Sequence, residues 1–145
     1  MSNSWINILK PIVERCLYEV PYQLQKESGR RVAFVKTDGD PAINAEIYCE
    51  NLVKNELKKM AMPLILYSEE QGYLMNAVGA KFITLLDPID GTFFALRELP
   101  GGCIAISIHE TSSMEPVAAI IGDYLNKDIY WASEEGAFMN GKPIY

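Results

Sequence analysis

The sequence predicts an α+β fold in which two helices pack on a largely antiparallel sheet. Apolar residues recur with a helical period in the first 60 residues, and short apolar runs follow from residue 63 onward. Alternating polarity in residues 104–108 and turn signals such as Asn126-Lys127-Asp128 favour antiparallel neighbours among these later runs. Helices first and strands later are typical of helices layered on one face of a sheet.

The first predicted helix carries an apolar stripe along one face. The stripe consists of Trp5, Ile8, Leu9, Ile12, Val13, Cys16, Leu17 and Val20. Pro11 and Pro21 weaken the pattern, because a proline inside a helix costs about 3 kcal/mol. We therefore expect a kink at Pro11 and an end or a bend near Pro21, with Gly29 closing the segment.

A strand is predicted over residues 32–35, and a second helix after Asp40-Pro41, which form a plausible cap and first-turn pair. The apolar stripe of this helix is Ala45, Tyr48, Cys49, Leu52, Val53, Leu57 and Met60. The remaining predicted strands are residues 64–67, 82–86, 103–108, 117–121, 129–132 and a short piece around 137–138.

Size and composition restrict the class of protein. The 145 residues predict a single domain spanning 1–145, and the net charge of −6 without a basic block argues against nucleic-acid binding. No apolar run approaches the roughly 18 residues that a membrane span needs. Three cysteines without metal-type spacing, Cys16, Cys49 and Cys103, are interpreted as buried free thiols of a protein in the reducing cytoplasm.

The chemistry of the chain is concentrated where an apolar strand meets the segment Asp87-Pro88-Ile89-Asp90-Gly91-Thr92. Asp87 and Asp90 follow buried aliphatic residues, and burying an unpaired carboxylate costs several kcal/mol. A metal ion is the natural partner for such carboxylates. Gly91 permits a sharp turn, and Thr92 can open a short helix whose free N–H groups would receive an anion. Ligands for a metal beside an anion site indicate phosphate chemistry.

Two further acidic clusters stand at predicted loops. Ser68-Glu69-Glu70 directly follows a predicted strand, and Thr37-Asp38-Gly39-Asp40 precedes Glu46 on the second helix. Carboxylates that converge from adjacent strand ends suit Mg²⁺, which takes oxygen ligands. The alternatives are a solvated turn for Ser68-Glu69-Glu70, a solvated helix carboxylate for Glu46 and a simple capping role for Thr92.

These motifs together resemble the inositol monophosphatase family, within the fructose-1,6-bisphosphatase-like, lithium-sensitive phosphatases. The resemblance lies in Lys36–Pro41 with Ala45-Glu46, in Ser68-Glu69-Glu70, in Asp87–Thr92, and in Ile129–Ala132 with Gly136–Pro143. All four motifs occur in the order of that family's N-terminal half. The resemblance therefore implies the N-terminal domain of that fold, without the family's C-terminal domain.

The resemblance also implies a set of metal ligands. Glu69, Asp87 and the backbone carbonyl of Ile89 would hold an activating Mg²⁺. Asp87 would bridge to a second ion that Asp90 also binds. Glu70 is implied as a ligand of a weaker third ion.

Catalytic and phosphate-binding roles are implied in the same way. Thr92 and Glu46 would position and deprotonate the attacking water, and the amides of Gly91 and Thr92 would bind the phosphate. The chain departs from the family pattern at three of the neighbouring positions. Glu46 replaces the usual aspartate, Ile43 stands where threonine is common, and Phe94 occupies the usual asparagine position.

The implied function is Mg²⁺-dependent hydrolysis of a phosphomonoester of inositol or a sugar, fructose 1,6-bisphosphate included. The alternative is a non-catalytic or regulatory metal-binding module that needs a partner. The family's second half supplies a further metal ligand and most contacts to the substrate. We therefore expect an exposed apolar face, covered by a second copy of the chain or by a partner chain.

Overall fold

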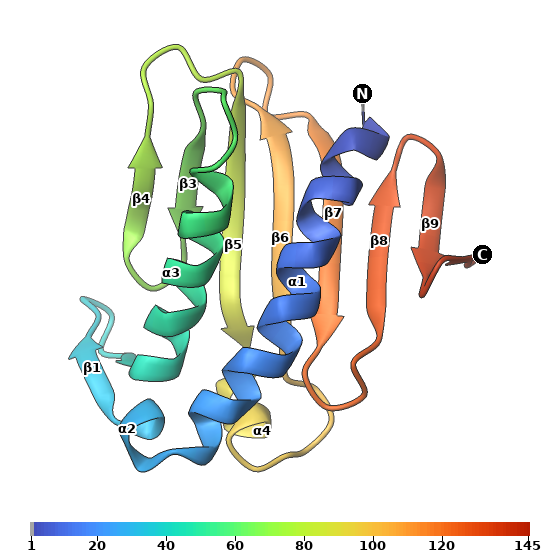
Figure 1. Cartoon of the computed structure of the whole chain (residues 1–145). Helices are drawn as coiled ribbons and strands as arrows, with labels where there is room; N and C mark the ends of the chain where they lie inside the picture. The colour runs from blue at the N-terminus through green and yellow to red at the C-terminus, as the bar shows by residue number, and fades with distance from the viewer. Residues whose placement is uncertain (1) are drawn as a thin grey trace.

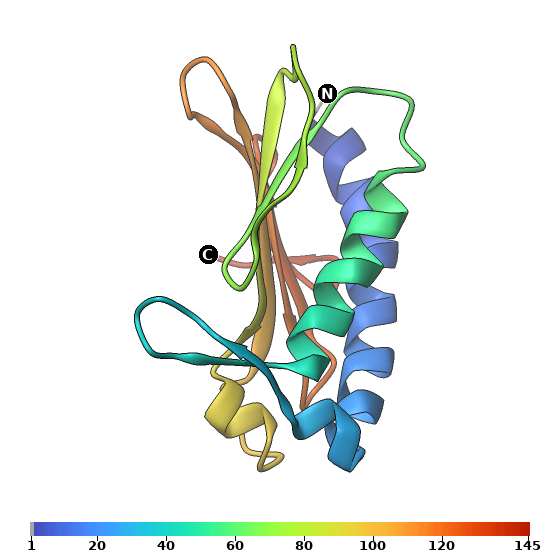
Figure 2. The same cartoon turned by 90° about the vertical axis from the view of Figure 1, so that its left-hand side faces the viewer.

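An eight-stranded sheet forms the centre of the fold, and two long helices cover only one of its faces (Figures 1 and 2). The computed structural model describes residues 2–145, with side chains described from residue 5 onward. In this described part of the chain, no helix combines the length and the apolar character needed to cross a membrane. The α+β arrangement predicted from the sequence is confirmed.

The helices are α1 (Ser2–Gln25), α2 (Glu27–Arg30), α3 (Asn44–Leu57) and α4 (Thr92–Ala95). A two-stranded sheet contains β1 (Val32–Val35) and β2 (Pro41–Ile43). The large sheet contains β3 (Ile65–Ser68), β4 (Gly72–Asn76), β5 (Phe82–Asp90), β6 (Cys103–Glu110), β7 (Pro116–Asp123), β8 (Ile129–Ser133), β9 (Gly136–Met139) and β10 (Lys142–Pro143).

The strand order of the large sheet is β10-β9-β8-β7-β6-β5-β3-β4. Every neighbouring pair is antiparallel except β3 and β5, which run parallel and place Ser68 opposite Leu86. Because parallel strands end at the same edge of a sheet, the residues that follow β3 and those at the end of β5 lie together. This single parallel pair positions the acidic segments of the sequence.

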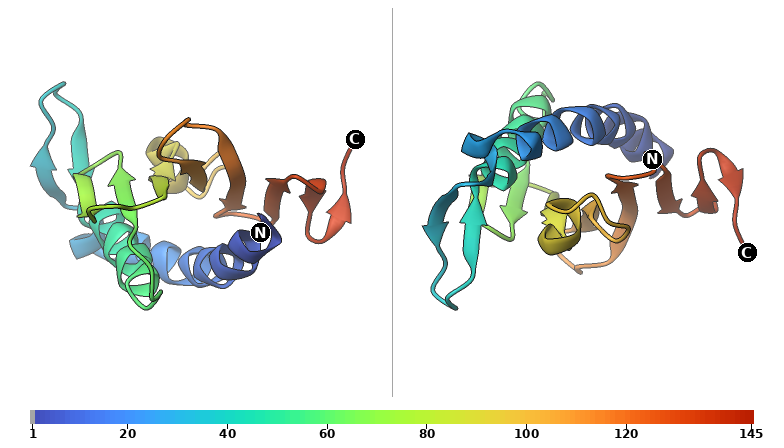
Figure 3. Two further views of the ribbon diagram at one scale, coloured as in Figure 1. Left: turned by 90° about the horizontal axis from the view of Figure 1, so that it is seen from above. Right: turned by 90° about the horizontal axis from the view of Figure 1, so that it is seen from below.

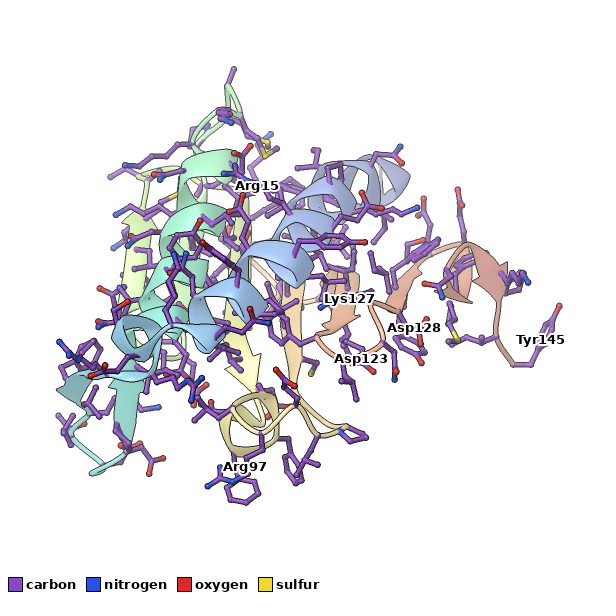
Figure 4. The ribbon with its side chains drawn as sticks, turned by 60° about the horizontal axis from the view of Figure 1, so that its bottom comes forward. Arg15, Arg97, Asp123, Lys127, Asp128 and Tyr145 are labelled. Carbon is purple, nitrogen blue, oxygen red and sulfur yellow. The ribbon has the colours of Figure 1, made fainter. Side chains whose placement is uncertain are left out.

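The core lies between the helices and one face of the sheet. Both helices turn their apolar stripes toward strands β5–β8, and the buried side chains include Leu9, Val13, Leu17, Cys49, Val53, Leu86, Ile104, Ile106 and Ile120. Lys127 in the β7–β8 turn binds α1, because its Nζ donates a hydrogen bond to the carbonyl of Leu17 at 2.8 Å (Figure 4). Most residues of the predicted stripes lie in this core. Tyr48 is exposed, and Ile8 and Met60 are only half-buried, Met60 because it lies beyond the end of α3.

The opposite face of the sheet is open (Figures 2 and 3). A shallow, mainly apolar groove runs across it between Tyr67, Leu85, Ala105 and Ala119. Ile121 on this face is 43% exposed. The expectation that a second copy or a partner chain covers this face stays a prediction.

At the far edge of the sheet, the C-terminal strands extend beyond the helices (Figure 3). Residues 136–145 are all half-buried or exposed. Trp131 and Phe138 stack across β8 and β9 with their ring centroids 5.5 Å apart. Aromatic stacking across the pair is thus a main side-chain contact of this edge.

The first helix does not end or break where the prolines predicted. It continues through Pro11 and Pro21 to Gln25 and buries Leu24 in its last turn. Pro11 is exposed and Pro21 half-buried, so both lie off the core face. Burial of the long apolar stripe outweighs the backbone hydrogen bonds that the two prolines remove.

The second helix begins later than predicted, since residues 41–43 pair with β1 as strand β2. Glu46 takes over the capping role expected of Asp40-Pro41, because its Oε2 accepts a hydrogen bond from the Ile43 amide at 2.8 Å. Strand β4 at the sheet edge was not predicted, and β5 runs four residues beyond its predicted end at 86. A short edge strand carries too weak an alternation to be recognised from its sequence alone.

We expect Gly122→Val to destabilise the protein by about 1–3 kcal/mol. A Cβ at residue 122 would lie 2.6 Å from Val13 Cγ1 and 2.9 Å from Leu17 Cδ2, so α1 has to move away from β7. Urea unfolding measures the loss. The matched control is Ala119→Val, which adds volume to the open face of the same strand and should stay within about 0.5 kcal/mol of wild type. Equal losses for both variants would contradict the close packing of α1 on Gly122.

Candidate metal and phosphate site

The site lies at the edge where β3 and β5 end. The amide of Glu69 donates to the carbonyl of Leu86 at 3.0 Å, which extends the parallel pairing by one residue beyond Ser68. This contact brings Glu69 alongside Asp87, the next residue of β5. Two of the predicted metal ligands, more than fifteen residues apart in the sequence, are therefore neighbours in space.

A tight turn follows at Gly91. This residue has φ +73° and ψ +43°, a left-handed conformation that glycine adopts without strain. A Cβ here would lie only 2.5 Å from the carbonyl oxygen of Gly101. The turn leads directly into α4, which begins at Thr92, so the predicted glycine turn and short helix are both confirmed.

The predicted catalytic pair is in direct contact. Glu46 is 2% exposed in the first turn of α3, and its Oε1 lies 2.6 Å from the hydroxyl of Thr92. The same hydroxyl lies 2.9 Å from the carbonyl of Ile89, and its single proton serves one acceptor at a time. Burial raises the pKa of Glu46, while hydrogen bonds from Thr92 and the Ile43 amide oppose that rise. Glu46 is thus neither a solvated helix residue nor distant from the loop.

Lys36 is the cation of this cluster. Its Nζ lies 3.2 Å from Glu69 Oε1 and 3.3 Å from Glu70 Oε2, and its side chain is 13% exposed. Burial alone would lower the pKa of Lys36. The hydrogen bonds with Glu69 and Glu70 raise it by a larger amount, so the pKa lies above its ordinary value. The sequence analysis named Lys36 only as part of a motif and gave it no role. Its contact with Glu69 and Glu70 depends on how the β1–β2 hairpin packs.

Asp87 and Glu70 are carboxylates with too little positive charge around them. Asp87 Oδ1 is buried and has no hydrogen-bond partner among the described residues. Burial, with the charges of Glu69 and Asp90, raises the pKa of Asp87 to about 7. Burial, with the charge of Glu46, raises the pKa of Glu70 to about 7 as well. An unpartnered buried oxygen among hard carboxylate donors fits a divalent cation such as Mg²⁺.

The ligands are close but not yet assembled. Within the described residues, no three acidic, cysteine or histidine side chains already converge tightly enough to hold a metal ion. Asp90 is exposed at the rim, where Cys103 Sγ lies 3.9 Å from its Oδ2. The side chains would have to rotate in order to bind an ion together. The ligand roles therefore stay predictions for all five residues: Glu69, Asp87, Ile89, Asp90 and Glu70.

Cys103 differs from the other two cysteines. It is only half-buried, whereas the prediction of a buried thiol is confirmed for Cys16 and Cys49. It is the first residue of β6 and pairs with Asp90 at the end of β5. All three thiols are free.

A buried hydrogen-bonded contact between α3 and Gln71, which was not predicted from the sequence, lies next to Glu69 and Glu70. Glu50 is fully buried on α3, and its carboxylate accepts hydrogen bonds from the amide of Gln71, at 3.3 Å, and from the Gln71 side chain. The contact fixes the segment of Glu69 and Glu70 against the helix. Glu50 lies one turn after Glu46, so one face of α3 supports both parts of the site.

Several known proteins are similar to this chain in sequence or in fold. A model of the inositol monophosphatase family matches residues 12–145. The fructose-1,6-bisphosphatase/inositol-1-monophosphatase of Methanothermobacter thermautotrophicus is 26% identical over 97% of this chain and 54% of its own length. Nus factor SuhB of Xylella fastidiosa is 31% identical over 75% of this chain and 38% of its own.

Among solved structures, the extragenic suppressor protein suhB from Bartonella henselae superposes with a TM-score of 0.84 at 20% identity. The superposition covers 97% of this chain and 53% of that protein, so it supports the fold. The chain thus spans about half the length of the relatives that it matches over almost all of its own length. The family model matches well over half of the residues, and this chain belongs to the inositol monophosphatase family.

Proposed function

We propose that this chain forms the metal- and phosphate-binding part of a Mg²⁺-dependent phosphatase. Its substrate would be a phosphomonoester of inositol or a sugar, fructose 1,6-bisphosphate included. One observation carries the proposal: Glu69 and Asp87 converge from two strands beside the hydrogen-bonded pair of Glu46 and Thr92. Membership of the family supports phosphatase chemistry in general.

The carboxylates would bind the metal. Glu69, Asp87, Asp90 and the carbonyl of Ile89 supply oxygen ligands at the end of β5, and bound Mg²⁺ would lower the pKa of the attacking water and offset phosphate charge. Lys36 neutralises part of this cluster, and Glu69, which it contacts at 3.2 Å, would be one of the residues that hold the metal. Protons also leave, since Asp87 carries a pKa of about 7 without metal.

Glu46 and Thr92 would move the proton of the attacking water. The Thr92 hydroxyl donates to Glu46, which leaves the oxygen of Thr92 free to accept a hydrogen bond from water. A proton can then pass through this hydroxyl to the buried Glu46. The raised pKa of that carboxylate makes it a stronger base near neutral pH. The amides of Gly91 and Thr92, at the left-handed turn, would hold the phosphate.

We also propose that the protein works in the reducing cytoplasm. Cys16 and Cys49 lie with their sulfur atoms 3.9 Å apart in the core and remain unbonded. A pair of thiols this close supports a compartment in which disulfides do not form.

Phosphate release tests the function directly. We expect the chain to release phosphate from inositol 1-phosphate or fructose 1,6-bisphosphate with Mg²⁺ and not with EDTA. Glu46→Gln should lower the rate by about 10²–10⁴-fold, since it removes the proton acceptor but no metal ligand. The control Glu56→Gln alters an acid on the outer surface and should keep the rate. Binding of Mg²⁺ without any phosphate release would instead support the alternative of a non-catalytic metal-binding module.

Metal titration tests the ligand assignment. We expect Asp87→Asn to weaken Mg²⁺ binding at least ten-fold more than Glu70→Gln, because Asp87 is assigned to both main ions and Glu70 only to a weaker third. Isothermal titration calorimetry of both variants beside wild type gives the comparison. Equal affinities for the two variants would overturn the assignment.

The stability of the metal-free protein should depend on pH through Asp87. Its folded-state pKa of about 7 exceeds its ordinary value of 3.8, so the proton favours the folded state, and this stability is lost as pH rises toward 7 and beyond. In EDTA, Asp87→Asn should therefore stabilise the protein at pH 8, by about 1–3 kcal/mol after allowance for solvent screening. At pH 5, which lies between the ordinary and the folded-state pKa of Asp87, the gain should be less than half as large, and it should vanish only below about pH 4. Urea unfolding at both pH values measures this, and a gain that is the same at pH 5 and pH 8 would contradict the explanation.

A further inference from the structure

Tyr124 is a buried residue that the mechanism above does not use. It directly follows Asp123, the last residue of β7, and is 5% exposed. Its hydroxyl donates to the carbonyl of Pro88 at 2.6 Å. The sulfur of Cys49 on α3 lies 3.6 Å from the same oxygen. The side chain of Tyr124 thus extends from the end of β7 to Pro88, which lies between Asp87 and Asp90.

The backbone of Tyr124 is fixed independently of its side chain. Its amide donates to the carbonyl of Gly102 at 3.0 Å, in the connection that follows α4. Its carbonyl accepts a hydrogen bond from Lys127, which also binds α1 at Leu17. The phenol therefore projects from a rigid base.

Its acceptor, Pro88, lies in an irregular part of β5. Asp87 pairs with Ala105 and Asp90 pairs with Cys103, so two residues of β5 stand opposite one residue of β6. Such a bulge takes its residues out of the regular ladder of backbone hydrogen bonds. The Tyr124 hydroxyl donates to the carbonyl of Pro88 instead. The Thr92 hydroxyl lies 2.9 Å from the carbonyl of Ile89, but its single proton is directed to Glu46.

The shape of this bulge decides where the predicted ligands point. Asp87 precedes it, Asp90 follows it, and the carbonyl of Ile89 lies within it. The peptide between Pro88 and Ile89 links these groups, so its orientation affects the path of the backbone from Asp87 to Asp90. The hydrogen bond from Tyr124 to the Pro88 carbonyl opposes a change in that orientation.

We propose that Tyr124 is a positioning residue of the metal site, whose hydroxyl holds the bulge of residues 87–90 in the conformation that binds a divalent cation. This inference rests on the proposed function, because it concerns the affinity for a metal. The hydrogen bond from Tyr124 to Pro88 is present in the metal-free chain. Its effect is on the affinity for the metal, and Tyr124 does not touch substrate.

The test compares Tyr124→Phe with Cys49→Ala in the full chain, using Mn²⁺ as the probe. Tyr124→Phe removes the hydroxyl that reaches Pro88 and keeps the ring. Cys49→Ala disturbs the other neighbour of the same hydroxyl and leaves a core cavity, which controls for general destabilisation. Electron paramagnetic resonance of free Mn²⁺ gives the affinities, and thermal unfolding in EDTA gives the stabilities.

We expect Tyr124→Phe to weaken Mn²⁺ binding by about 10-fold or more, as is usual when a group that orients a metal ligand is removed. Cys49→Ala should stay within about two-fold of wild type, even with a lower unfolding temperature. Equal affinities for wild type and Tyr124→Phe would overturn the inference. Equal weakening in both variants would do so too, because it would indicate a loss of stability alone.

A second measurement separates this inference from the proposed function. Hydrogen exchange of the metal-free proteins should be faster at the amides of residues 89–92 in Tyr124→Phe than in Cys49→Ala. If wild type binds no Mn²⁺ while these amides still differ, the proposed function fails and the positioning of the bulge stands. Unchanged exchange in Tyr124→Phe would reject the positioning role whatever the metal affinity.

Discussion

The parallel pairing of β3 with β5 is the constraint on which the site depends. Every other strand of the large sheet runs antiparallel to its neighbour, and an antiparallel partner would carry Glu69 to the opposite edge. The parallel pair instead brings the ends of two strands together, and the amide of Glu69 extends it by one residue. Helix α3 then adds Glu46 from its first turn and Glu50 from its second. The site is therefore a product of topology, with its acids supplied by three separate segments of the chain.

Electrostatic repulsion is the cost of this convergence. Asp87 and Glu70 both have a pKa of about 7 in the folded chain, because burial and neighbouring carboxylates disfavour their charged forms. Lys36 relieves only part of the repulsion, since its ammonium group reaches Glu69 and Glu70 and leaves Asp87 Oδ1 without a partner. These clustered carboxylates therefore disfavour the folded state of the metal-free chain near neutral pH, and the rest of the fold has to offset this cost.

Sequence patterns predicted the elements that have a strong period or a special residue. The stripes of the two helices, the strand cores and the turn at Gly91 all follow from local chemistry, as does the suspicion that Asp87 and Asp90 need a partner. Of the end or bend predicted near Pro21, the end is wrong, because burial of Leu24 extends the helix past it. The prediction for Asp40-Pro41 is also wrong, because pairing with β1 turns residues 41–43 into a strand. These outcomes depend on tertiary packing, which no local window contains.

The long-range contacts that support the site from outside could not be predicted. Nothing near Lys36, Glu50 or Tyr124 in the sequence indicates their partners, which lie 33, 21 and 36 residues away. Such contacts depend on the strand order and on the packing of α3, and both are decided by the whole chain. The resemblance to a family supplied the candidate ligands, whereas the groups that support them emerged only from the three-dimensional arrangement.

The thin edge formed by β8, β9 and β10 determines where the molecule opens first. Residues 136–145 contribute no buried side chain, and the stack of Trp131 on Phe138 is a modest anchor. Local opening should begin at this edge, while β3, β5 and β6 stay closed beneath the helices. Local unfolding would therefore start at the edge of the sheet that is remote from the carboxylates. Strands β8, β9 and β10 could then open transiently while the segment of residues 87–92 remains folded.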